Sequence, residues 1–245
     1  MQRILIILIA VFSTLPASGQ WSVEVESGLS FQSYNDVRIP NQSGTTFGFN
    51  EDFELQGPVI PFRLRLNFTF YEKNHFSALF APLALDYEGS APFDIQFQST
   101  LFEQGEYIRG FYKFNSYRLG YRRDFLQTEN WTLGIGFTTK IRDARVKLST
   151  AELSDKKDDL GFVPLLNIYA AYHHNNLTFW LDGDGLAGGP GRAFDVFMGA
   201  KGPLLDNKLL IKGGYRLLEG GADVSDVYNF TLVHFAVLGL IWNFY

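Results

Sequence analysis

Apolar and polar side chains alternate along much of this chain with a period of two. The clearest example runs from Phe62 to Phe70, where phenylalanine and leucine alternate with arginine, asparagine and threonine. Successive side chains of a β-strand point to opposite faces, so this period indicates strands with one apolar and one polar face. We predict strands over ten such segments: Trp21–Phe31, Phe62–Phe70, His75–Tyr87, Ile108–Phe125, Trp131–Leu148, Phe162–Tyr172, Leu177–Ala187, Ala193–Leu204, Leu209–Leu218 and Tyr228–Phe244.

The connections between these segments alternate between short and long. Short polar turns follow the even-numbered segments, at 72–74, 127–130, 173–176 and 206–208. The links after the odd-numbered segments are mostly longer, at 35–57, 88–107, 149–161 and 219–227, with the Gly/Pro-rich 188–192 the shortest. An even strand number with short turns at one end and long loops at the other is typical of bacterial outer-membrane β-barrels. Both termini are then expected on the short-turn, periplasmic side.

The two faces of the strands differ in a way that distinguishes a membrane barrel from a soluble sandwich or a lipocalin-like barrel. Soluble β-proteins turn their large apolar residues inward and their charges outward. Here one face carries Phe, Leu or Trp on nearly every strand, while the other mixes Gly, Ser, Thr and charge. A continuous apolar band beside such charges fits lipid outside and a polar interior. We therefore predict an all-β fold, a closed antiparallel transmembrane β-barrel of about ten strands; eight strands, or twelve using Phe93–Phe102, are the alternatives.

Composition narrows the classes of function. Of the 245 residues, 16% are aromatic and 19% charged, and no apolar run reaches the roughly 18 residues that a spanning helix needs. The lack of cysteine excludes disulfides, thiolate metal sites and thiol nucleophiles. A net charge of −5 argues against nucleic acid as a partner, because binding to phosphates needs a basic surface.

The start of the chain has the features of a secretory signal. Arg3 gives a positive beginning, residues 4–12 are apolar, and Ala17 and Gly19 are small residues where a signal peptidase reads the chain. We predict a cleaved signal peptide over 1–19, a barrel domain over 20–245, and localisation in the outer membrane.

Aromatic residues gather near the predicted short turns. Tryptophan prefers the boundary between lipid and water, so this placement indicates an aromatic girdle at the periplasmic interface. The predicted girdle comprises Trp21, Trp131, Trp180, Trp242 and Phe244.

The last strand carries a resemblance to a known class of proteins. Leu238, Leu240, Trp242 and Phe244 alternate up to the end of the chain, which closes with Tyr245. This pattern resembles the closing strand that outer-membrane barrels present to their assembly machinery, and the segments 162–167, 186–196 and 214–230 resemble parts of uncharacterised small Gram-negative outer-membrane barrels. The resemblance implies a monomer surrounded by outer-membrane lipids and lipopolysaccharide. It implies no defined activity and no cofactor.

Strand parity also predicts which charges face the lumen. A ten-stranded barrel is too narrow for an open porin channel, so these side chains are expected to interdigitate as an ionic plug. We expect Glu24 and Glu26 to pair with Arg63 and Arg65 on the next strand. The basic residues Arg118, Arg122, Lys140 and Arg142 suggest an anion site as a sharper alternative. The full predicted set is Glu24, Glu26, Arg63, Arg65, Arg118, Arg122, Lys140, Arg142, Asp182, Asp184, Asp195, Lys201, Lys212 and Arg216.

Known barrel enzymes give a test by residue type. Barrel-type lipid A deacylases use a His-x-Ser pair, but His234 is followed by Phe235 and Ala236. Omptin proteases use an Asp pair that faces an Asp-His pair near the outer rim. Asp182 and Asp184 have the spacing of half of this, while His75, His173 and His174 fall in predicted periplasmic turns. We therefore predict no catalytic residues and no metal site, and a structural, ligand-binding or narrow transport role. A Ser or Asp within hydrogen-bond reach of His234 would favour an enzyme instead.

Overall fold

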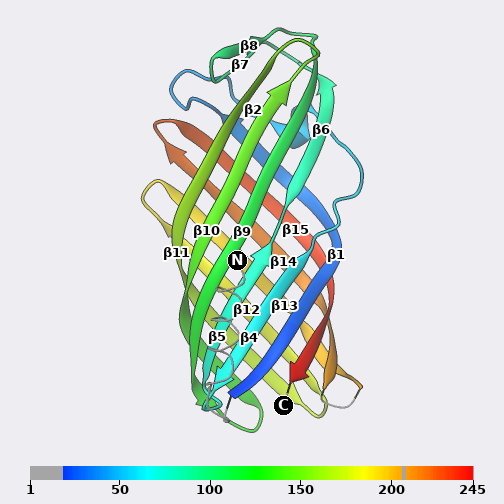
Figure 1. Cartoon of the computed structure of the whole chain (residues 1–245), viewed down its shortest axis with the longest axis vertical. Helices are drawn as coiled ribbons and strands as arrows, with labels where there is room; N and C mark the ends of the chain where they lie inside the picture. Colours follow the sequence, from blue (N-terminus) through cyan, green and yellow to red (C-terminus); the bar gives the residue numbers. More distant parts are fainter. Residues whose placement is uncertain (1–18, 206–207, 245) are drawn as a thin grey trace, which may run out of the picture.

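The computed structural model shows an elongated β-barrel and describes residues 19–205 and 208–244 (Figure 1). Two short strands in line, β5 and β6, together occupy the third strand position of the wall, because both pair with β9. They are separated at Pro82. The wall strands are β1 (Gly19–Arg38), β4 (Arg63–Phe70), β5 (Asn74–Ala81), β6 (Ala84–Ser90), β9 (Tyr107–Gln127), β10 (Trp131–Ser149), β11 (Ser154–His174), β12 (Leu177–Gly188), β13 (Gly191–Leu205), β14 (Leu209–Val224) and β15 (Val227–Phe244).

Pairing between the first and last strands closes the barrel. β1 and β15 are antiparallel from the pair Trp21 and Phe244 to the pair Arg38 and Tyr228. Neighbouring strands around the wall are also antiparallel, so the ten-stranded closed barrel is confirmed and the counts of eight and twelve are wrong. The segment considered for a twelve-stranded barrel instead forms a separate hairpin of β7 (Ile95–Phe97) and β8 (Thr100–Phe102).

Two predicted long loops are mostly strand. β10 and β11 continue to Ser149 and from Ser154, and β14 and β15 continue to Val224 and from Val227. The predictions of loops over 149–161 and 219–227 are therefore wrong. Beyond the lipid, a strand keeps its backbone ladder without an apolar face, so the alternation that marks a strand in sequence disappears while the pairing persists.

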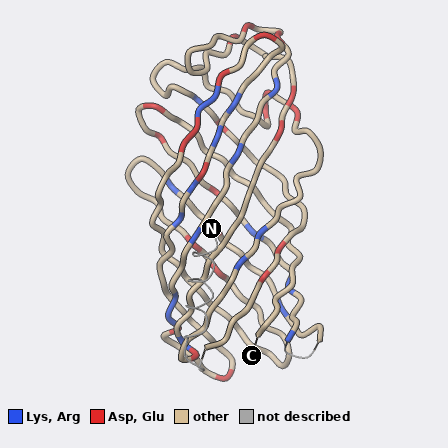
Figure 2. Tube along the Cα trace, in the orientation of Figure 1, with Lys and Arg blue, Asp and Glu red and all other residues tan. Residues whose placement is uncertain are grey.

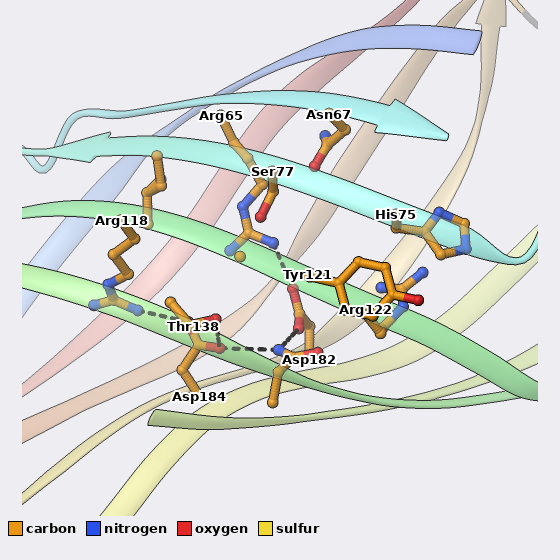
Figure 3. Close-up of a pocket in the computed structure, with 13 residues that line it drawn as sticks. Arg65, Asn67, His75, Ser77, Arg118, Tyr121, Arg122, Thr138, Asp182 and Asp184 are labelled. Carbon is orange, nitrogen blue, oxygen red and sulfur yellow. Dashed lines mark hydrogen bonds and ion pairs between the residues drawn. The ribbon is translucent and has the colours of Figure 1, made fainter. Parts of the chain in front are cut away.

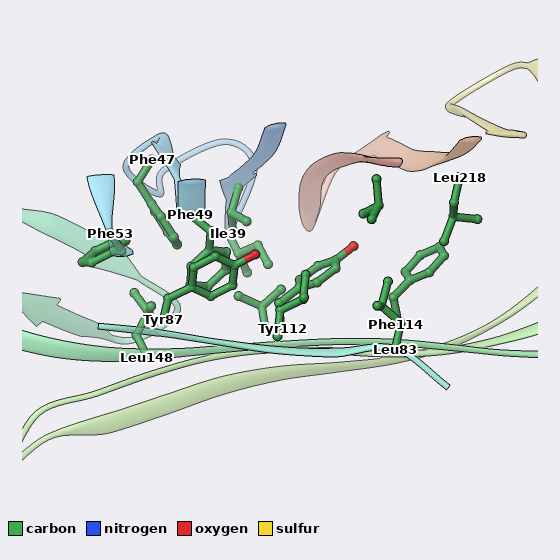
Figure 4. Packing of buried hydrophobic residues seen from close by; sticks show 14 of the residues in the cluster. Ile39, Phe47, Phe49, Phe53, Leu83, Tyr87, Tyr112, Phe114, Leu148 and Leu218 are labelled. Atoms are coloured by element: carbon green, nitrogen blue, oxygen red, sulfur yellow. The ribbon is translucent and has the colours of Figure 1, made fainter. Parts of the chain in front are cut away.

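The segments after β1 and β6 fold over and into the outer mouth of the barrel. Between β1 and β4 lie β2 (Phe47–Gly48), α2 (Phe49–Asp52) and β3 (Glu54–Leu55). Phe47, Phe49 and Phe53 point into the barrel and pack with Tyr87 and Tyr112 in a buried apolar cluster (Figure 4). α2 has four residues, and no described helix is long and apolar enough to cross a membrane.

Candidate functional site

The inner half of the lumen, on the side of the short turns, holds a network of ion pairs centred on Glu26 of β1. The Arg216 guanidinium donates to both Glu26 oxygens, from Nε at 2.7 Å and from Nη2 at 2.8 Å. Lys212 Nζ lies 2.6 Å from Glu26 and 2.5 Å from Glu24. Arg216 Nη1 also donates to Asp195 at 2.6 Å. These bonds join β1 to β13 and β14, which are not its neighbours in the wall.

Two further arginines extend this network across the barrel. Arg63 lies 3.4 Å from Glu26 and 2.9 Å from Asp195. Arg118 bridges Asp195 at 2.6 Å and Asp184 at 3.0 Å. Charged residues of both signs occur at mid-height along the chain trace on many strands (Figure 2). Since the bridged residues come from β1, β4, β9, β12, β13 and β14, the network spans the lumen from wall to wall.

One predicted pairing is wrong in detail. Glu26 does contact Arg63, but Glu24 pairs with Lys212, and Arg65 pairs with Asp182 at 2.6 Å. Glu24 and Arg65 are directly opposite in the register. The prediction considered only the adjacent strand, whereas in so narrow a lumen long side chains also reach partners on strands further around the wall.

A small polar void of about 40 Å³ lies beside the network. Arg65, Arg118, Asp182 and Asp184 approach it from opposite walls, and Thr138 donates to Asp184 (Figure 3). This volume suits one or two water molecules and no larger solute. Asp182 and Asp184 are thus engaged in the lumen and do not lie at an outer rim as the omptin comparison requires.

Asp124 belongs to the lumen but was not among the predicted residues. It is 3% exposed and accepts from Arg122 Nε at 2.9 Å, with His75 Nε2 at 2.8 Å. His75 is therefore a strand residue facing the lumen, and His173 and His174 are the last residues of β11, so the prediction that these three histidines lie in turns is wrong. Asp124 shares the parity of Arg118 and Arg122, so the same rule applied to the strand end would have found it.

Trp180 does not belong to the aromatic girdle, so that part of the prediction is wrong. Its ring is buried inside the barrel against Phe197, at 4.8 Å between centroids, and Lys201 Nζ lies 5.2 Å from the ring centroid. Its parity is that of Asp182 and Asp184, which already placed it inward. Trp131, Trp242 and Phe244 are exposed on the outer surface near the short turns, and Trp21 packs with Phe68 there.

Lys140 differs from the other lumen cations of the network. Its side chain is 1% exposed, and its ammonium lies 4.5 Å from the centroid of the Phe114 ring. Within the part of the chain that the structure describes, no carboxylate lies within ion-pair distance of Nζ. The face of an aromatic ring offsets only part of the cost of burying a charge. Lys140 is thus a buried amine that could still take an acidic partner.

Lys140 lines a cavity of about 350 Å³ that passes through the barrel wall. Phe114 and Lys140 reach it from the lumen, while exposed Phe162, Pro164 and Leu186 reach it from outside. A second cavity of about 260 Å³ adjoins it and shares Arg142 and Phe114. Arg192, Val163 and Pro190 also line the cavity. The rest of its walls are small residues of the β12–β13 and β14–β15 hairpins: Gly188, Gly191, Ala193, Gly220, Gly221 and Ala222.

The opening exists because the ladder between β11 and β12 stops early. The last pair is Leu166 with Gly185, although β11 begins at Ser154 and β12 runs on to Gly188. Pro164 lies just beyond this pair and lacks the N–H that a strand with two partners uses. The β12–β13 hairpin ends far below the β10–β11 hairpin, so the outer part of β11 has no neighbour on this side (Figure 1).

Arg142, two residues beyond Lys140 toward the outer end of β10, also lines the opening. Its Nη2 pairs with Asp159 of β11, and its buried Nε has no hydrogen-bond partner among the described residues. Of the four predicted anion-site residues, Lys140 and Arg142 therefore reach this cavity, whereas Arg118 and Arg122 are held by carboxylates in the inner network.

Comparisons with known proteins give the fold. No family model matches the chain, and no curated protein matches it in sequence. A structure of the outer membrane protease OmpT from Escherichia coli covers 94% of this chain and 99% of its own, at 11% identity and a TM-score of 0.53. Ail, the attachment invasion locus protein of Yersinia pestis, solved with the heparin analogue sucrose octasulfate, covers 93% and 99% at 13% identity and 0.43. The chain has the fold of bacterial outer-membrane β-barrels.

Proposed function

We propose that this protein binds an anionic amphiphile, with the chemistry of a long-chain carboxylate, that enters the barrel wall sideways from the outer leaflet. The observation that carries this proposal is Lys140, a buried amine with no carboxylate within ion-pair distance among the described residues, at the inner end of a mostly apolar opening. A carboxylate there would supply the missing partner, and charge-assisted hydrogen bonds are among the strongest in proteins.

The surface around the opening supports entry from lipid. Phe162 and Leu166 project outward from β11 and are 68% and 56% exposed. An apolar chain could therefore leave the hydrocarbon region and enter between β11 and the β12–β13 hairpin without crossing water. The cavity of about 350 Å³ falls in the usual size range of small-molecule sites.

A route straight through the barrel is not part of the proposal. The ionic network spans the inner half of the lumen, and the apolar cluster around Phe49 and Tyr112 fills the outer mouth. We expect planar bilayers containing the protein to show no stepwise ionic conductance. Steady conductance would favour a transport path along the lumen instead.

Binding of a pyrene-labelled hexadecanoic acid to the protein in lipid nanodiscs tests the site, with the matching pyrene alcohol as the uncharged probe. We expect Lys140→Met to weaken binding of the acid by about 2 kcal/mol, or about thirty-fold, and to leave the alcohol unchanged. Lys201→Met is the matched control, since Lys201 also faces the lumen beside an aromatic ring but lies away from the opening.

A second variant tests the path. Gly188 lines the opening, and a Cβ built there meets no atom within 4 Å. Gly188→Phe should therefore fold normally and weaken both probes together by obstruction. Equal binding of acid and alcohol by the unmodified protein, or unchanged binding of the acid by Lys140→Met, would contradict the proposal.

The setting of the protein is also proposed. We expect a monomer in the outer membrane, in contact with phospholipid and lipopolysaccharide and assembled through recognition of the strand ending at Trp242 and Phe244. Membrane fractionation with an antibody against the chain, and the mass of the barrel in nanodiscs, test these expectations.

A further inference from the structure

A second polar cluster lies on the outer surface of the barrel, facing lipid. The Ser33 hydroxyl oxygen is 2.8 Å from His234 Nε2, and the Tyr215 hydroxyl contacts Nδ1 of the same ring. Phe31 stacks on the imidazole at 5.0 Å between centroids with 15° between the planes. Ser33 comes from β1, His234 from β15 and Tyr215 from β14, so barrel closure brings the three together.

A β-bulge aims Ser33 at the histidine. In the register of β1 and β15, Phe31 pairs with His234 and Gln32 with Val233, but Tyr34 pairs with Leu232, so Ser33 is an extra residue without an opposite partner. Bulges of this kind redirect a side chain and recur beside active sites. Without Ser33, the pairing of β1 with β15 would pass from Gln32 directly to Tyr34. The lipid face would then have no additional side chain beside His234.

The depth of the cluster matches the depth of lipid ester groups. His234 is eight residues from Trp242 along β15. At a rise of about 3.3 Å per residue and a tilt of about 40°, this is about 20 Å along the membrane normal, against an apolar band of about 25 Å. One step further out, Tyr34 donates to Glu219 at 2.6 Å, and Arg192 donates to the same carboxylate. The cluster thus lies where hydrocarbon meets headgroups on the outer side.

We propose that Ser33 and His234 form a hydrolytic site for ester-linked acyl chains of outer-leaflet lipids, with Tyr215 as a positioning residue. When Nδ1–H donates to the Tyr215 hydroxyl, Nε2 carries the lone pair that accepts the Ser33 proton. This is the nucleophile, base and orienting group arrangement of acyl-transfer enzymes. The inference is independent of the proposed binding at Lys140.

The chemistry balances with water as the only co-reactant. Ser33 Oγ bonds to the ester carbonyl carbon as its proton passes to His234 Nε2. That proton then goes to the leaving alcohol oxygen as the ester C–O bond breaks, which leaves an acyl-serine. Water gives a proton to Nε2 and its hydroxide attacks the acyl carbon, so that a fatty acid leaves and Ser33 regains its proton.

The first experiment measures released fatty acid by mass spectrometry after the protein is reconstituted in two kinds of vesicle, phospholipid alone and phospholipid with lipopolysaccharide. Release from either one supports the proposal and identifies the source of the ester. We expect Ser33→Ala and His234→Gln to lose at least about 100-fold of the rate, in the range of a removed nucleophile or base. Ser27→Ala is the matched control, since Ser27 lies lower on the same face of β1, opposite Leu238.

Tyr215→Phe tests the positioning role. We expect about a tenfold loss together with a shifted pH midpoint of the rate, because Nδ1 loses its acceptor; an unchanged pH profile would contradict this role. The three residues lie on the lipid face, so the variants should keep the folded migration of the barrel in unheated gels. Labelling by a fluorophosphonate at Ser33, mapped by peptide mass, adds a readout without lipid. No fatty acid release from either vesicle would overturn the proposal.

Discussion

The two halves of the lumen are filled by opposite kinds of side chain. In the inner half, Glu26, Asp195 and Arg216 are buried and joined by ion pairs, while the outward-facing residues are apolar. In the outer half, Phe49, Tyr87 and Tyr112 pack together as in the core of a soluble protein. One continuous barrel is thus polar inside at membrane depth and apolar inside at its mouth.

The difference follows from what surrounds each half. At membrane depth the apolar residues must face lipid, so the polar ones are left inside and have to pair with one another. Towards the mouth the wall meets water, and the segment after β1 brings Phe47, Phe49 and Phe53 to cover apolar lumen residues. We expect the ion pairs to stabilise the whole barrel and the apolar cluster to stabilise mainly its own loops.

The largest effect is expected from Arg216→Met. This change leaves Glu26 and Asp195 buried without their best donor, which costs about 3 to 5 kcal/mol in a typical buried pair. Reversible urea unfolding in lipid vesicles measures it. A double-mutant cycle of Glu26→Ala with Arg216→Met should show strong coupling, whereas the cycle of Glu26→Ala with Arg65→Ala should show little, because Arg65 pairs with Asp182. Weak coupling in both cycles would mean that the charges are separately hydrated.

An intermediate effect is expected from Phe49→Ala. Phe49 is 0% exposed, and truncating a buried phenylalanine costs about 3 kcal/mol or more. We expect this loss to appear as rapid proteolysis of the 39–62 segment while urea unfolding of the barrel changes little. Phe93→Ala is the control, since that phenylalanine is 38% exposed. A large drop in the urea midpoint with Phe49→Ala would show that the two halves unfold as one unit.

The smallest effect is expected from Asp155→Asn, at the tip of β11. The Asp155 carboxylate accepts from Ser99 N at 3.1 Å, Ser99 Oγ at 3.0 Å and Thr100 Oγ1 at 3.0 Å, which ties the β7–β8 hairpin to the wall. Partial burial raises the pKa of Asp155, but the hydrogen bonds from Lys156 N and Ser99 outweigh it and hold the pKa below its usual value.

Because folding lowers this pKa, the contribution of Asp155 is complete above the unfolded value of about 3.9 and is lost as the pH falls through the folded value. We expect Asp155→Asn to lower the free energy of local opening of residues 95–102 by about 1 kcal/mol at pH 7, measured as faster amide exchange. Exchange in β14 should not change. Unchanged exchange in the hairpin would assign its anchoring to the apolar contacts alone.

Much of the fold could be predicted from the sequence because lipid imposes a strict rule on each strand. The parity that turned Phe62 and Leu64 outward turned Arg63 inward, where it is 6% exposed. The outer extensions of β11 and β14 were missed because no lipid enforces alternation there. Trp180 was misplaced when residue type was preferred to parity.

The sites were harder to predict because each depends on residues far apart in the chain. The sequence offered no serine beside His234 in its own strand, whereas Ser33 reaches it from β1 through a bulge that the alternation does not reveal. Lys140 was among the predicted lumen charges, but its lack of a partner depends on where the β11–β12 ladder stops.

The long span of the inner ion pairs has a consequence for assembly. Glu26 lies near the start of the barrel, while its partners Lys212 and Arg216 are more than 180 residues later. While the chain is being inserted, Glu26 can already meet Arg63 of the neighbouring β4, but it has no cation of β14 until the final hairpin arrives. Closure of the ring and completion of the ion-pair network are therefore a single late event, and a barrel halted before that event would hold water where the finished one holds the salt bridges to β14.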